Sequence, residues 1–224
     1  MMPTNIPVMA LGTHDVDNAI FHVSSVLQVP VLVFALLALA AVIFELGAFG
    51  VELRSRRRRH FGAISAAADR ARAALLTGDR PGAASAVGGV ARSPAMADTI
   101  AFVVKHARTD GGDHQLNKAL ADFDFDAQRR LARTRLLVRI GPALGLMGTL
   151  IPLSPALTGL ANGDTAALST DLRIAFSVTV VGLLIGAVAF GLSLSRDRMY
   201  GQDLSDLEYL AAVISDPRPG GAGA

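Results

Sequence analysis

The sequence predicts an all-α membrane protein with three transmembrane helices and long helical cytoplasmic extensions. Three observations lead to this prediction. Three apolar runs are each long enough to cross a hydrocarbon core of ~30 Å, for which about 20 helical residues suffice. Only 18% of the 224 residues are charged, whereas about 25% are charged in an average soluble chain. The segment between the first two runs shows apolar residues at helical spacing.

The chain divides into seven predicted segments. In order, they are an extracytoplasmic N-terminal segment (1–28), transmembrane helix 1 (29–53), a cytoplasmic helical segment (54–139), transmembrane helix 2 (140–161), an extracytoplasmic loop (162–171), transmembrane helix 3 (172–195), and a cytoplasmic helical tail (196–224). The last residues of the tail, DPRPGGAGA, are expected to be disordered because they are rich in glycine and proline.

Basic residues predict the direction of the spans. Residues 54–139 hold 17 of the 21 Lys and Arg residues, beginning with the run RSRRRRH, whereas residues 1–28 hold none. By the positive-inside rule the N-terminus lies outside and the C-terminus is cytoplasmic. We interpret the arginine run as a topology and anionic-lipid signal rather than a nucleic-acid patch. Because no basic region precedes it, the first span is predicted to be a retained anchor and not a signal peptide.

Local signals predict helices in the cytoplasmic segment. An alanine-rich helix ends at Thr77-Gly78, and Ser93 caps another that begins at Pro94. After Asp113, a stripe at spacings of three and four marks an amphipathic helix that runs on without a turn signal into the second span. Its members are Leu116, Leu120, Phe123, Ala127 and Leu131. Nothing in this segment suggests a separately folded domain, a repeat or a sheet.

The composition excludes several kinds of chemistry. The chain has no cysteine, so disulfides, thiolate metal sites and cysteine nucleophiles are excluded. The spans contain no Ser/His or paired-carboxylate constellation, and all five histidines lie outside the predicted hydrocarbon core. We therefore expect no enzyme, no cofactor and no metal site.

Small residues mark the second and third spans as packing helices. Gly141 and Gly145 share one face of the second span, and Gly182 and Gly186 share one face of the third. Such faces allow close backbone approach in lipid, where little hydrophobic force joins helices. Gly148 is a further packing candidate, whereas the first span, rich in Leu, Val, Ile and Phe, is expected to face lipid. The prolines of the second span free carbonyl groups, which suggests a pore or a moving interface; they are Pro142, Pro152 and Pro155.

Hydroxyl groups are the main polar groups of these spans. Thr149 and Thr179 are expected at similar depth near mid-membrane, about 15 Å and 10 Å along their helices from opposite ends, and Ser177 lies toward the outer half. Two interpretations stay open. Each hydroxyl bonds to a carbonyl one turn back, or the matched pair lines a pore.

Ionisable groups are scarce in the spans. The interiors of spans two and three hold no Asp, Glu, His or Lys, although proton relays through membranes use such groups. Glu45 is the one embedded carboxylate. It either pairs with a cytoplasmic arginine or snorkels toward the cytoplasmic side, or it takes part in ion transfer. Asp171 and Arg173 stand at the edge of the third span. If ions cross, the titrating group is Glu45 or belongs to a partner chain.

Two motifs resemble those of the MotA/TolQ/ExbB proton-channel family. The stretch PALGLMGT, beginning at Pro142, resembles the family signature P-L-L-G-L-L-G-T-V. The stretch AFSVTVVGL, beginning at Ala175, resembles the third-helix motif, in which a threonine stands three residues before Gly-Leu. The order of segments resembles the three-span TolQ/ExbB branch rather than the four-span flagellar stators.

The resemblance implies a function. It implies an inner-membrane ion channel subunit of an energy-transducing motor, with five copies in a ring around two single-span partners of the ExbD/TolR type. An aspartate of the partner would carry the ion, H⁺ or Na⁺. The implied pore-lining residues are Thr149, Thr179, Ser177 and Pro142. The competing hypothesis is an oligomeric membrane scaffold that conducts nothing.

The chain departs from the family pattern at the third span and in the second. The ExbB branch often carries a glutamate five residues before the third-helix threonine, where this chain has Ile174. Asp171, one turn away, is a possible substitute. Pro152 and Pro155 are further departures, and they leave the geometry of the outer half of the second span open.

Overall fold

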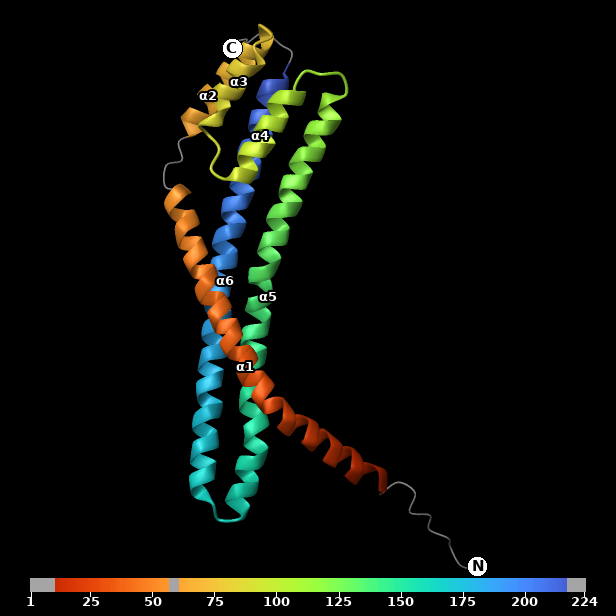
Figure 1. Ribbon diagram of the computed structural model, residues 1–224, viewed down its shortest axis with the longest axis vertical. Helices are drawn as coiled ribbons and strands as arrows, with labels where there is room; N and C mark the ends of the chain where they lie inside the picture. The colour runs from red at the N-terminus through yellow and green to blue at the C-terminus, as the bar shows by residue number, and fades with distance from the viewer. Residues whose placement is uncertain (1–10, 57–60, 217–224) are drawn as a thin grey trace, which may run out of the picture. The chain divides into compact units, whose positions relative to one another are not determined.

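The computed structural model describes residues 11–56 and 61–216, and within these ranges it contains helices and turns but no strand (Figure 1). The helices are α1 (Leu11–Arg56), α2 (Phe61–Leu76), α3 (Arg80–Gly88), α4 (Pro94–His106), α5 (Gly112–Ala161) and α6 (Thr165–Ser215). Three of them are long and apolar enough to cross a membrane: α1 over His22–Arg54, α5 and α6. The predicted fold class, an all-α membrane protein with three spans, is therefore confirmed.

Some predictions fall on residues outside the described ranges. These are the first residues of the N-terminal segment (1–10), most of the arginine run (57–60) and the end of the tail (217–224). Which side of the membrane each terminus occupies remains a prediction from the distribution of basic residues.

Two helices begin earlier than the apolar runs indicated. Helix α1 starts at Leu11, well before the predicted span at residue 29, and α6 starts at Thr165. The expected loop 162–171 is therefore a short turn. Gly163 reverses the chain with a φ of 82°, and the Asp164 carboxylate accepts a hydrogen bond from the Ala167 amide at 2.9 Å, which caps α6.

The chain forms two compact units. One, the membrane unit, consists of residues 1–46 and 134–190, and the other, the extension unit, of residues 47–133 and 191–224. Each contains its own cluster of buried hydrophobic side chains. The middle segment does not fold by itself, because α2, α3 and α4 share a core with parts of α5 and α6.

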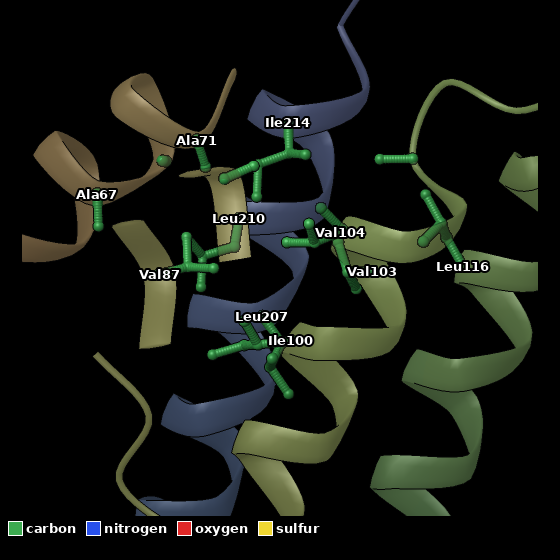
Figure 2. Close-up of a cluster of buried hydrophobic side chains, with 14 of the residues drawn as sticks. Ala67, Ala71, Val87, Ile100, Val103, Val104, Leu116, Leu207, Leu210 and Ile214 are labelled. Atoms are coloured by element: carbon green, nitrogen blue, oxygen red, sulfur yellow. The ribbon is translucent and has the colours of Figure 1, made fainter. Parts of the chain in front are cut away.

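The core of the extension unit draws on five helices (Figure 2). Ala67 and Ala71 of α2 are fully buried against larger side chains of the other helices. The partners drawn there are Val87 of α3, Ile100, Val103 and Val104 of α4, Leu116 of α5, and Leu207, Leu210 and Ile214 of α6. Because alanine is common on exposed helix faces too, a core-facing stripe of alanines is hard to recognise in sequence.

Helix α3 was not predicted, although a signal for it exists. The Asp79 carboxylate accepts a hydrogen bond from the Gly82 amide at 2.8 Å, and a proline stands in the first turn. Asp followed closely by Pro is a signal for the start of a helix. The signal is easily overlooked here because the helix is only nine residues long.

The predicted start of α4 and the predicted stripe of α5 are confirmed, whereas Asp113, expected to cap α5, lies inside its first turn. The Ser93 hydroxyl accepts a hydrogen bond from the Met96 amide at 3.1 Å, so it caps α4. Helix α5 continues unbroken from Gly112 into the second span. Four members of its stripe are buried and Leu120 is partly buried; the four are Leu116, Phe123, Ala127 and Leu131.

A buried ion network joins the turn between α3 and α4 to helix α6. The guanidinium of Arg92 lies 3.3 Å from an Asp203 carboxylate oxygen and also contacts the Asp206 carboxylate. Both carboxylates are almost fully shielded from solvent. Asp203 and Asp206 are three residues apart, so both project from the same face of α6. The network ties the turn to that face.

In the membrane unit α5 and α6 run side by side, joined by the turn at Gly163, and α1 crosses the pair (Figure 1). One stripe of α1 is buried with Leu144, Ile185 and Ala189 of the other two helices. This stripe consists of Val31, Ala35, Ala38 and Val42. The remaining large side chains of the span, such as Phe34 and Phe44, are exposed. The expectation that the first span faces lipid therefore holds for one side only.

Replacing Arg92 with alanine is expected to destabilise the extension unit. Two buried carboxylates would lose this counter-charge, and breaking a buried ion pair by removing one partner costs about 3–5 kcal/mol. Chemical unfolding of the full chain in detergent, followed by circular dichroism, measures the change. Lys118→Ala is the control, because Lys118 and Asp122 form an exposed pair whose loss costs less than about 1 kcal/mol. Equal effects of the two substitutions would contradict the assigned role of Arg92.

Candidate functional site

The candidate site is the seam where α5 and α6 touch in the membrane unit. A Cβ atom added at Gly141 would lie 2.8 Å from the Gly182 carbonyl oxygen and 2.8 Å from the Gly186 amide nitrogen. One added at Gly182 would lie 2.6 Å from the Gly141 carbonyl oxygen. Real Cβ atoms essentially never come this close to other atoms. The two helices are therefore in direct backbone contact.

The seam continues in both directions from this contact. Gly186 lies against the ring of Pro142, whose Cγ atom would be 2.8 Å from an added Cβ. On the other side, Gly145 lies against the backbone of Thr179, with an added Cβ 3.3 Å from the Thr179 Cα atom. Gly148 follows one turn later, with the side chain of Val178 over it. As residue numbers rise along α5 they fall along α6, so the pair is antiparallel.

The hydroxyl of Thr179 bridges the seam. Its Oγ1 atom lies 3.2 Å from the Ala175 carbonyl oxygen, one turn back, and 3.2 Å from the Gly145 carbonyl oxygen of α5. The single hydroxyl proton is thus shared between a carbonyl of its own helix and one of the neighbouring helix. A glycine at 145 favours the approach, because an added Cβ atom would lie only 3.3 Å from the Thr179 backbone.

The other hydroxyls bond within their own helices. Thr149 donates to the Leu146 carbonyl oxygen at 2.8 Å, and Ser177 donates to the Arg173 carbonyl oxygen at 2.8 Å. Thr149 and Thr179 are half-buried, whereas Ser177 is exposed. In each case the proton is directed to a carbonyl, as the first of the two sequence interpretations states. The lone pairs of the oxygen are still able to accept a hydrogen bond.

Of the remaining predicted residues, Pro142 takes part in the seam contact, and the charged ones are not among the nearest neighbours of the seam glycines. Glu45 is half-buried in α1, and Asp171 is half-buried in the first turns of α6, with Arg173 exposed two residues later. Pro142 is largely exposed although its ring touches Gly186. The structure thus brings together Thr179, Pro142 and the glycines, which are Gly141, Gly145, Gly148, Gly182 and Gly186.

Sequence reasoning missed the contribution of α1 to this region. Val31, Ala35, Ala38 and Val42 recur at spacings of four, three and four and are buried against α5 and α6. Two alanines at this spacing within a Leu-rich span were the available signal, since small residues mark helix contacts in lipid.

Comparison with known proteins gives one finding for this region. The family model of the MotA/TolQ/ExbB proton channel family matches residues 89–198. The matched range includes α4, all of α5 and the part of α6 that carries Thr179 and the glycines. No curated protein matches the chain.

Replacing Gly182 with alanine is expected to weaken the pairing of α5 and α6. The added methyl group would overlap the backbone at Gly141, and overpacking of this kind costs about 1–3 kcal/mol. Unfolding of the full chain in mixed micelles measures the change. Gly191→Ala is the matched control on α6, because nothing lies within 4 Å of its added Cβ. There alanine should leave stability unchanged or raise it by up to about 1 kcal/mol. A Gly182→Ala protein as stable as the control would contradict the backbone contact.

Proposed function

Because the chain belongs to the MotA/TolQ/ExbB proton channel family, we propose that it is the channel-forming subunit of an ion-driven motor in the inner membrane. The family is a channel-type membrane family, and the three apolar helices make this a multi-pass membrane protein. The proposal adds that copies of the chain form a ring, with five as the number implied by the resemblance. The ring would surround two single-span partners of the ExbD/TolR type, whose membrane aspartate carries the ion.

One structural observation carries the proposal: the threonine hydroxyls direct their protons to carbonyls. Thr149 donates to Leu146 and Thr179 donates to Ala175 or Gly145. Each oxygen therefore offers lone pairs to a neighbour, and a protonated carboxyl group is a neighbour that needs an acceptor. When the carboxyl group loses its proton, rotation of the hydroxyl turns the same oxygen into a donor for the carboxylate.

The scarcity of charge in the seam fits this role. The second and third spans hold no Asp, Glu, His or Lys in their interiors, and transfer of a proton needs a titrating group. A partner aspartate supplies it without leaving a buried carboxylate in this chain. The tight α5–α6 contact then holds the hydroxyls at constant positions while the partner moves.

A second candidate function is a membrane scaffold that conducts no ions. The same hydrogen bonds favour it in one respect, because a hydroxyl that bonds to its own helix is fully explained by helix stability. The two functions differ in what the hydroxyls do when a partner is present, and substitution at both positions separates them.

The double substitution Thr149→Val/Thr179→Val is expected to lower ion flux by roughly tenfold or more, because each lost hydrogen bond to a charged or reacting group is worth about 1.5–3 kcal/mol. Proton uptake into liposomes measures the flux, with the chain co-purified with a neighbouring single-span protein that carries one membrane aspartate. Valine keeps the shape of threonine, so loss of the hydroxyl is the main change.

Thr170→Val is the control, because Thr170 donates to Ala166 one turn back in the same helix at 3.1 Å but lies outside the seam. Flux that needs the partner but is unchanged by the double substitution would contradict the assignment of the two threonines. A stable oligomer that binds no such partner and conducts nothing would favour the scaffold. Replacing H⁺ by Na⁺ in the gradient identifies the transported ion.

A further inference from the structure

A glutamine lies on the buried stripe of α1. Gln28 stands three residues before Val31 and seven before Ala35, so it shares the face that packs against α5 and α6. It is half-buried. A polar side chain on the packed face of a membrane helix is costly unless it finds a hydrogen-bond partner. The Gln28 amide therefore needs a hydrogen-bond acceptor on a neighbouring helix.

Helix α5 offers a carbonyl that lacks its helical donor. Pro152 has no amide hydrogen, so the carbonyl of Gly148, four residues earlier, loses the bond that an α-helix normally makes there. Both residues are buried in the membrane unit. In hydrocarbon a freed carbonyl must be satisfied by a neighbouring helix, a side chain or an ordered water.

Gln28, Gly148 and Pro152 line the same narrow gap between the helices. The gap is too small to hold a water molecule. Apart from Gln28 its lining side chains are all hydrocarbon or absent; these residues are Val31, Leu32, Gly148, Ile151, Pro152 and Ile174. The amide of Gln28 is thus the side-chain donor within this gap, and water does not replace it there.

We propose that the Gln28 side-chain amide donates a hydrogen bond to the Gly148 carbonyl that Pro152 leaves without a helical partner. The proposal requires the glutamine side chain to turn toward the Gly148 carbonyl within the gap that both residues line. The bond ties α1 to α5 at the proline. It also positions the backbone immediately before Thr149, so Gln28 is a positioning residue. The proposed bond assumes only that α5 lies in lipid. Its expected effect on ion flux rests on the proposed function.

A double-mutant cycle in the full chain tests this bond. Gln28→Met keeps the length of the side chain and removes the amide. It is expected to raise the unfolding equilibrium constant in mixed micelles by about threefold to tenfold, the range for interhelical hydrogen bonds in membranes. Pro152→Ala restores the helical bond to Gly148, so in that background Gln28→Met is expected to have no effect. Pro155→Ala is the matched control, because Pro155 is exposed on the same helix and should give no rescue.

The outcomes separate the bond from its consequence. Equal effects of Gln28→Met in the wild-type, Pro152→Ala and Pro155→Ala backgrounds would overturn the proposal, as would no effect in the wild type. Rescue by Pro152→Ala alone would establish it. Liposome flux is measured on the same variants, with a loss in Gln28→Met restored by Pro152→Ala as the expected result. Pro152→Ala could abolish the effect of Gln28→Met on stability while neither the wild type nor any variant conducts ions. That result would support the bond and count against the proposed function.

Discussion

Backbone contact between α5 and α6 is the constraint on which the membrane unit depends. In lipid the tails around a helix are as apolar as its leucines, so burial of apolar area does not hold helices together and close packing must do so. At Gly141 and Gly182 the two backbones approach so closely that neither position has space for a methyl group. The hydrogen bond from Thr179 to the Gly145 carbonyl at 3.2 Å depends on the same approach.

Packing of neighbouring helices around α5 helps the helix to tolerate its prolines. Helix α5 runs unbroken through Pro142, Pro152 and Pro155, although each removes one helical hydrogen bond. Pro142 fits against Gly186, where a larger side chain would meet its ring. Pro152 lies on the buried side with α1 nearby. Neighbouring helices thus supply the packing that a single helix in lipid lacks.

The extension unit is held by different physics. Alanine, valine, leucine and isoleucine side chains of five helices form a hydrophobic core. Transfer of their apolar surface out of water is favourable, mainly through entropy near room temperature. Within it, Arg92 meets two carboxylates of α6 in a nearly dry environment. Buried ion pairs contribute little net stability against apolar packing, but separating the partners is costly because a buried charge is then left uncompensated. The network therefore specifies how the α3–α4 turn lies on α6.

Elements that depend on local chemistry were predictable from the sequence. The length of the apolar runs predicted three spans, Ser93 and Pro94 marked the start of α4, and the lack of a turn signal predicted one long α5. The glycines and threonines of the seam were recognisable because small and polar residues are unusual in a span. Contacts between distant segments were not predictable in this way and became known from the folded arrangement. Three such contacts depend on which helix faces meet. They are the hydrogen bond from Thr179 across to Gly145, the burial of one side of α1, and the pairing of Arg92 with Asp203, 111 residues away. Sequence periodicity describes one helix at a time and does not contain that information.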